Sequence, residues 1–166
     1  MQHLPDFAVL LYQQPDIASL CLTLQDEQGC QVPVLLAYCW HICVIGPVTP
    51  NTANAWREHA STKASGAIEP LREARTWMKT HWPDAEAIRE RIKKAELQLE
   101  MQLLEEMEAL VFSSTPGSPI PRSHTNLTGQ IDEALLGFSE YYGITMSEHE
   151  RLLLSESCLS IAKNAD

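Results

Sequence analysis

The 166-residue sequence predicts an all-α protein that folds as a single multi-helix domain. Prolines and capping residues mark the starts of most of its apolar segments, which is typical of helices. In the second half of the chain, apolar residues recur at spacings of three and four, the period of one helix face. Once these helices are assigned, no convincing strand remains.

Local signals define the individual helices. Proline is preorganised for the first helical position, and a following aspartate suits the positive helix end. Threonine and serine cap helix starts, and glycine commonly follows a last turn. The expected starts are Pro5-Asp6, Pro15-Asp16, Thr49-Pro50, Pro70, Pro83-Asp84 and the capping box Ser147-x-x-Glu150, and the expected stops are Gly29, Gly46 and Gly143. These signals predict helices over residues 5–14, 15–28, 32–45, 50–64, 68–81, 84–112, 125–142 and 147–162.

We expect all residues, 1–166, to form one domain whose core contains Leu36 and Trp40, in the middle of the most apolar helix. Its expected parts are a core over 5–81, a long amphipathic helix over about 84–112, a turn-rich linker over 113–123 and a C-terminal helical pair over 124–162.

One apolar stripe runs along the long helix. At about 1.5 Å per residue this helix would be about 43 Å long, which is more than a small core must cover. Its far end is expected to pack under the C-terminal helices or, alternatively, to meet another chain. The stripe consists of Ile88, Ile92, Ala95, Leu99, Leu103, Met107 and Leu110.

Composition narrows the class of protein. The chain carries 12 basic and 22 acidic side chains, a formal net charge of −10. Nucleic acid is disfavoured as the main partner, because a phosphate backbone requires clustered lysines and arginines. Five cysteines, an odd number, favour a reducing cytoplasm over a secreted disulfide scaffold. The longest apolar stretch, residues 32–48, is shorter than the roughly 20 residues that cross a bilayer, so no membrane span is expected.

Cys39, His41 and Cys43 invite a metal site, because thiolate and imidazole are common zinc ligands. At about 100° per residue, however, the two cysteines share a helix face from which His41 points roughly 200° away. We interpret the five cysteines as buried, reduced thiols, and expect neither a metal nor a cofactor.

No catalytic residue is assigned. His59 has no identifiable nucleophile or orienting acid in the sequence, and a partly exposed surface histidine is the simpler interpretation. Asp26 and Glu27 are candidates for acid–base work, but they precede Gly29 and are more typical of a polar helix end. The sequence therefore favours a protein that is not an enzyme.

A cluster of basic residues is the stronger candidate for a binding site. Arg72, Arg75 and Lys79 lie on one helix face, and Arg57 and Lys63 belong to the preceding helix. Guanidinium groups suit a carboxylate or phosphate, and neighbouring tryptophans offer an apolar wall. The alternative is that these cations pair internally with acidic side chains. The candidate wall is Trp40, Trp56 and Trp77, and the candidate internal partners are Asp26, Glu27, Glu58, Glu69 and Glu73.

Several motifs resemble a family of small proteobacterial proteins of unknown function. The resemblance covers residues 7–79 well and the remainder more loosely, through the long acidic helix and Asn126-Leu127. It implies a helical, bacterial, cytoplasmic protein and supplies no reaction, cofactor or catalytic residue. The motifs are Tyr12-x-x-Pro15, Cys21-Leu22-x-Leu24-Gln25-Asp26-x-x-Gly29, the segment 32–40, Trp56, and Pro70-Leu71-Arg72-x-x-Arg75-x-x-x-Lys79.

Two functions remain open. The first is a non-enzymatic interaction or regulatory protein that engages another protein, or a second copy of itself, through the long helix or the Arg72 face. The alternative is a binding protein or enzyme that holds an anionic metabolite between the basic helix and the tryptophans. The candidate binding residues are Arg57, Arg72, Arg75, Lys79, Trp40 and Trp56. A pocket whose arginines lack acidic partners would favour the alternative, whereas a closed core with an exposed apolar stripe would favour the first.

Overall fold

A computed structural model describes residues 1–114 and 126–164, and within these residues the protein is all-α, as predicted. The helices are α1 (Leu4–Tyr12), α2 (Ile17–Gln28), α3 (Val32–Val44), α4 (Pro50–Lys63), α5 (Glu69–His81), α6 (Glu86–Ser114), α7 (Leu127–Tyr142) and α8 (Glu148–Asn164). A π-helical segment, η1 (Ala64–Ile68), joins α4 to α5, and a 3₁₀ turn, η2 (Pro83–Ala85), joins α5 to α6. Most of the predicted linker lies outside the described residues.

Most helix ends follow the predicted signals. The Thr49 hydroxyl accepts a hydrogen bond from the Thr52 amide, and Gly29 and Gly143 end α2 and α7 in the left-handed conformation. The capping box forms, because the Ser147 amide donates to the Glu150 carboxylate at 2.7 Å and the Glu150 amide donates to the Ser147 hydroxyl at 3.3 Å.

The start predicted at Pro15 is wrong by two residues. Asp16 has a φ of 63°, which is the left-handed region and cannot continue into a right-handed helix. Aspartate tolerates this conformation better than most residues, so Asp16 precedes α2 and the helix begins at Ile17.

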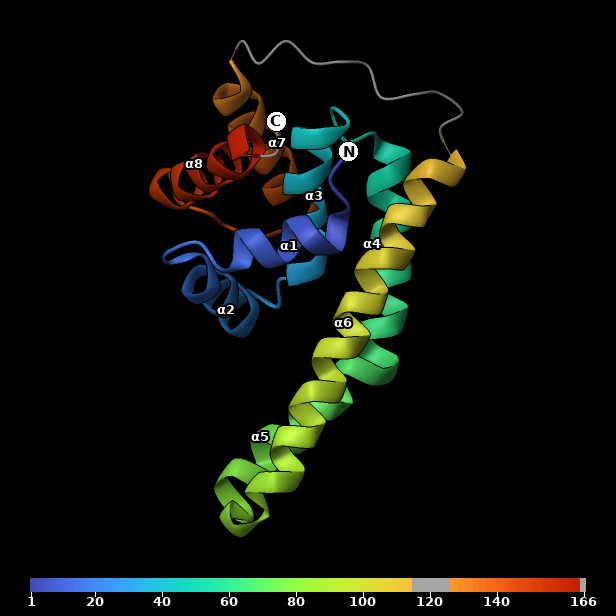
Figure 1. The fold of residues 1–166 in the computed structure, drawn as a ribbon, viewed down its shortest axis with the longest axis vertical. Coiled ribbons are helices and arrows are strands. Elements are labelled where there is room, and N and C mark those ends of the chain that lie inside the picture. Colours follow the sequence, from blue (N-terminus) through green and yellow to red (C-terminus); the bar gives the residue numbers. More distant parts are fainter. Residues whose placement is uncertain (115–125, 165–166) are drawn as a thin grey trace.

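Helix α3 is the centre of the folded body. Helices α1, α2, α4, α6, α7 and α8 all contact it, and its residues from Val34 to Ile42 are buried (Figure 1). The predicted core residues Leu36 and Trp40 are both buried, and the Trp40 indole donates a hydrogen bond to the Gln2 carbonyl at 2.9 Å. Because other helices surround α3, it has no side that faces solvent and therefore no polar face.

Helix α5 and the first part of α6 extend away from this body as a helical hairpin (Figure 1). Among the described elements, α5 contacts only η1, η2 and α6. Met78 is its one buried side chain. The expectation that residues up to 81 belong to the core is therefore wrong for α5, because the residues that it turns toward α6 are largely charged.

The stripe predicted on the long helix is buried over only part of its length. Leu103 and Met107 are buried against the body, whereas Ile88 and Leu99 are 48% and 37% exposed. In the described part of the chain, α6 contacts neither α7 nor α8, so its far end does not pack under the C-terminal helices as expected. It packs against α5, with which it forms the hairpin.

Across residues 1–114 and 126–164, no single helix is long and apolar enough to cross a bilayer. Helices α1 and α2 reach that length and composition only as a pair, with a 98° bend between them.

Candidate functional site at the projecting arm

We call residues 69–100 the arm: α5, η2 and the first half of α6. Helix α4, the π-helical segment η1 and α5 run in succession along α6, and all three contact it. A π-helical turn is rare and inserts an extra residue into the helix. Here it marks the point at which the chain leaves the body and enters the arm (Figure 1).

A four-residue ion network holds the two helices of the arm together. Arg72 Nε donates to Glu96 Oε1 at 2.9 Å, and its Nη2 donates to Glu100 Oε1 at 2.9 Å. Arg75 Nε donates to Glu96 Oε2 at 2.9 Å, and its Nη2 donates to Glu96 Oε1 at 3.3 Å. The Glu96 side chain is only 8% exposed, so this carboxylate is almost fully enclosed by the two arginines and the helices.

The two carboxylates of this network differ in electrostatic environment. Burial alone would raise the pKa of Glu96, but hydrogen bonds from Arg75 and Arg72 outweigh it and lower this pKa below its usual value. The pKa of Glu100 is instead raised by burial, which its single bonded arginine, Arg72, does not offset. Glu96 is the firmly ionised centre of the network.

The network changes the interpretation of the basic face. Arg72 and Arg75 are neutralised inside the protein, although by Glu96 and Glu100 of the long helix rather than by the acidic residues expected from the sequence. Lys79, one turn further along α5, is exposed and has no ion pair within the described residues. It is the member of the predicted face that remains available to a partner.

The structure does not bring Trp40 and Trp56 to the basic helix. Trp40 and Trp56 are fully buried in the body, and the Trp56 indole donates to the Met107 carbonyl at 2.9 Å. The pocket expected between Arg72 and these two side chains does not form, because both rings fill the core. Arg57, on α4, points to a different place and lies over the Tyr141 ring, 5.3 Å from its centre.

The other two tryptophans lie on the outside of the arm. Trp77 and Trp82 are each 55% exposed, and Trp77 stacks on His81 with the ring centres 4.8 Å apart. Ile88 and Leu97, from α6, add two more exposed apolar side chains. Trp77 was expected from the sequence as part of a pocket wall beside the basic helix, but the exposed surface that it shares with Trp82, at the end of α5, was not expected.

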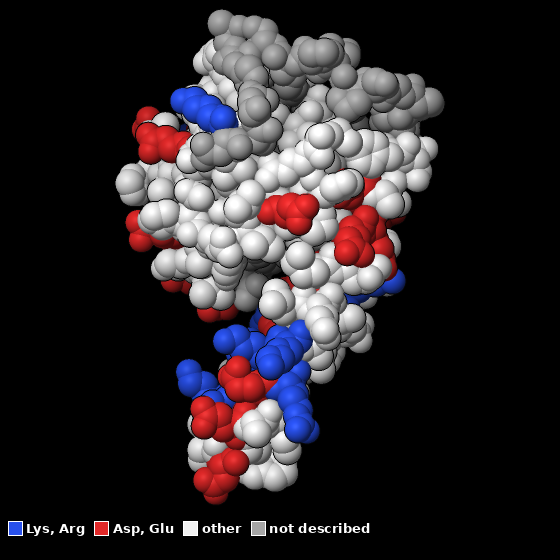
Figure 2. Space-filling model, in the orientation of Figure 1, with Lys and Arg blue, Asp and Glu red and all other residues white. Residues whose placement is uncertain are grey.

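Basic side chains are concentrated in the arm. Residues 69–100 contain 7 of the 12 basic and 7 of the 22 acidic side chains, so the arm is neutral overall, against a net charge of −10 for all other residues. Figure 2 shows most of the lysine and arginine side chains of that face gathered on the arm. The arm is thus a neutral segment of mixed charge that bears exposed aromatic rings on an acidic protein.

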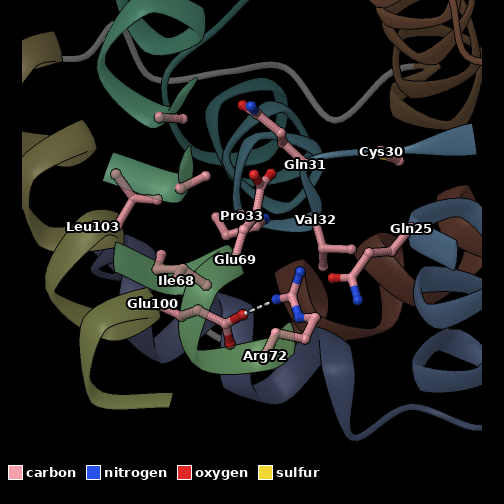
Figure 3. Close-up of a pocket in the computed structure, with 13 residues that line it drawn as sticks. Gln25, Cys30, Gln31, Val32, Pro33, Ile68, Glu69, Arg72, Glu100 and Leu103 are labelled. Atoms are coloured by element: carbon pink, nitrogen blue, oxygen red, sulfur yellow. Dashed lines mark hydrogen bonds and ion pairs between the residues drawn. The ribbon is translucent and has the colours of Figure 1, made fainter. Parts of the chain in front are cut away.

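A small pocket of about 110 Å³ lies at the base of the arm, between the α2–α3 turn, η1 and α6. Figure 3 shows Glu69 and Arg72 from α5 beside Glu100 from α6 at this site. Two carboxylates line the pocket, and its one arginine is already bonded to one of them. This lining does not suit an anionic metabolite.

The remaining candidates from the sequence have structural partners. Cys39 and Cys43 share a face that lies near the buried Cys158 of α8, and burial raises the pKa of Cys21 and Cys30 to about 12. All five cysteines are free thiols. Among the described residues, no group of three or more histidine, cysteine, aspartate or glutamate side chains is arranged to hold a metal ion.

The two histidines singled out from the sequence each contact another residue. His41 is buried, with Nδ1 2.6 Å from the Gly46 carbonyl. His59 is partly exposed, and its Nε2 lies 2.6 Å from Glu106 Oε2, a residue that sequence alone did not connect to it. Glu106 also lies 3.6 Å from Lys63, so the cluster has the composition of a surface ion network.

Comparison with known proteins identifies one family. A family model described as "Protein of unknown function (DUF2390)" matches residues 3–107, which include α1 to α5, the whole arm and most of α6. No curated protein and no solved structure matches the chain.

Proposed function

The chain belongs to the DUF2390 family of proteins of unknown function, and we propose that it is a non-enzymatic protein that binds another protein through its arm. The observation that carries this proposal is the distribution of side chains on the arm. Its charged residues Arg72, Arg75 and Glu96 are turned inward, whereas Trp77 and Trp82 are turned outward. In a helical hairpin that is stabilised by its own packing, apolar side chains lie between the two helices and charged side chains face solvent. The arm has the opposite arrangement.

The exposed aromatic rings are suited to a protein interface. Tryptophan and arginine are enriched among the residues that contribute most to binding, and burying a large apolar side chain gains about 1.5–3 kcal/mol. Trp77, Trp82 and Ile88 therefore offer anchors whose burial by a partner would stabilise a complex. The arm extends from the body, so a partner has access to it from several sides (Figure 1).

The exposed cations of the arm offer secondary contacts to a partner. Lys79, Arg91, Lys93 and Lys94 are exposed, and exposed acidic side chains of the arm lie among them. A protein surface with an apolar pocket for the rings and carboxylates opposite these cations would complement the arm. A second copy of this chain also carries acidic surface, so self-association is a distinct outcome of the experiment below.

We extend the proposal to the cellular location of the protein and to its domain organisation. Five unpaired cysteines support a reducing compartment, and we place the protein in the cytoplasm. We also regard the chain as one domain, because α6 is shared by the body and the arm.

A photo-crosslinking residue on the arm tests this function. The crosslinker replaces Trp82 in one variant and Leu152 in the other; Leu152 is exposed on α8, which does not contact α5 or α6 among the described residues. In the native cell, the arm position should give a discrete adduct with one other protein, identified by mass spectrometry, and the α8 position should not. Equal adducts from both positions, or none from either, would contradict the proposal. An adduct with a second copy would assign self-association instead.

A further inference from the structure

A second pocket, with a volume of about 180 Å³, lies on the body rather than at the arm. Three segments far apart in sequence meet there: the turn between α2 and α3, helix α4, and the end of α7 with the residues that follow it. Its floor is apolar and buried, formed by Val34, Phe138 and Ile144. Its polar rim includes Gln31, Arg57 and Ser61, the last two of which are exposed.

Hydrogen bonds between these segments hold the walls in place. Gln28 Nε2 donates to the Thr145 carbonyl at 2.9 Å, and the Thr145 amide donates back to Gln28 Oε1 at 2.6 Å. The Tyr142 hydroxyl donates to the Ala53 carbonyl at 2.9 Å and so fixes the end of α7 to α4. The pocket is therefore formed by the fold itself, which lowers the entropic cost of binding a ligand.

Arg57 is the one charged residue that lines this pocket. Within the described residues it has no ion pair, and its guanidinium rests on the Tyr141 ring. Its positive charge is therefore not offset by a carboxylate of the described residues. The donors of its guanidinium remain available to an anion.

The rim carries a second unused group. Gln31 Nε2 donates to the Ser61 hydroxyl at 3.1 Å, but its Oε1 is buried and has no hydrogen-bond partner. A buried polar atom without a partner is costly, and such atoms in native proteins are few. The Gln31 oxygen is an acceptor, so it can take an N–H or O–H group of a ligand but not a carboxylate; the group at this rim that suits an anion is the exposed guanidinium of Arg57.

We propose that this pocket binds a small monocarboxylate that carries one compact apolar group, such as an aromatic ring or a branched aliphatic chain. The carboxylate lies at the rim on Arg57, and the apolar group lies on Phe138 and Ile144. The size agrees, because a cavity of about 150 Å³ holds benzene. The arm contributes no residue to this pocket, so the ligand and the protein partner are tested separately.

Benzoate is the probe for this site. When it is titrated into the isotope-labelled full chain, the backbone amides of Gly29, Ser61 and Ile144 should show saturable NMR shifts. Benzamide, which has the same shape without the charge, should bind much more weakly. No saturable shift at these amides, or equal binding of benzamide and benzoate, would overturn the proposal.

Two variants of α4 provide the matched comparison. Arg57→Gln should weaken benzoate binding about ten- to hundredfold, because it removes a charge-assisted contact. Lys63→Gln removes one positive charge from an exposed position of the same helix that does not line the pocket, and should leave binding unchanged. Ser61→Phe should block the pocket and abolish the shifts while the remaining spectrum is preserved. Undiminished binding to Arg57→Gln or to Ser61→Phe would show that benzoate binds elsewhere.

Discussion

Replacing Glu96 with glutamine should loosen the arm and leave the body intact. The carboxylate accepts hydrogen bonds from three N–H groups of Arg72 and Arg75, at 2.9, 2.9 and 3.3 Å. A glutamine keeps one acceptor oxygen and turns an NH₂ group toward the remaining donors. Hydrogen bonds to charged groups contribute about 1.5–3 kcal/mol each, but the two arginine side chains are 25% and 30% exposed, so water replaces part of the loss. We expect a net cost of about 2–3 kcal/mol.

Amide hydrogen exchange shows which helices are destabilised. Because α5 contacts little besides α6, the amides of residues 69–81 should exchange about thirtyfold faster or more in Glu96→Gln, as a loss of about 2 kcal/mol requires. The amides of α3 should be unaffected. Glu105→Gln, which changes an exposed glutamate of α6 outside the arm, is the control and should change neither. Unchanged exchange in α5, or equal acceleration in α3, would refute the claim that Glu96 holds α5 against α6 in an arm that opens independently of the body.

Four further predictions concern the body, the pH dependence of two carboxylates, and the thiols. Trp40→Ala should lower the free energy of unfolding by about 3–5 kcal/mol, because a fully buried indole leaves a cavity, and an unchanged denaturation midpoint would disprove its core position. Glu96 has a lowered pKa, so its stabilisation is present above the ordinary value of 4.5 and is lost as the pH falls through the lowered value; the stability gap between wild type and Glu96→Gln should therefore shrink below pH 4.5. Glu100 has a raised pKa, so its protonated form stabilises the fold below pH 4.5, and this stabilisation is lost as the pH rises through the raised value. Glutamine does not ionise, so Glu100→Gln should gain stability relative to wild type in denaturant titrations between pH 4.5 and pH 7, and a loss would contradict this. Cys21 and Cys30 should resist alkylation at neutral pH until the chain unfolds, and the protein purified without chelator should contain no stoichiometric zinc or iron; rapid native labelling of either thiol, or bound metal, would show that the cysteines are not inert.

Helix limits were predictable where a local hydrogen bond decides them. Thr49, Gly143 and the pair Ser147 and Glu150 each act within one turn of their own position, so the sequence contains all the participants. Asp16 is the exception. Its left-handed backbone depends on how α1 and α2 turn past one another, which no neighbouring residue specifies.

The arm was not predicted, because the far end of the long helix was expected to pack under the C-terminal helices or, alternatively, to meet another chain. The part around Leu103 and Met107 does meet the body, but the part around Ile88 and Leu99 does not. The seam of the arm is charged instead of apolar. The spacing of its arginines on α5 and its glutamates on α6 was visible in the sequence, and pairing those two sets would have indicated the hairpin.

The candidate binding residues separated because their surroundings come from distant parts of the chain. Trp40 and Trp56 appeared suitable as a pocket wall, yet each donates its indole N–H to a backbone carbonyl in the core. Arg57 was grouped with Arg72 by sequence proximity, and the structure places it beside Tyr142, from a helix near the other end of the chain. Contacts at such separations are set by the topology and leave no periodic signal.

The affinity of the protein captured by the arm is the most direct test of the proposed function. That protein, once identified and purified, should bind the wild-type chain, and Trp82→Ala should weaken the binding by at least about tenfold, as expected for an aromatic anchor. Leu152→Ala, at a comparably apolar and exposed position on α8, should leave the dissociation constant unchanged. If Trp82→Ala binds as tightly as the wild type, or if both variants lose affinity equally, the arm is not the binding surface.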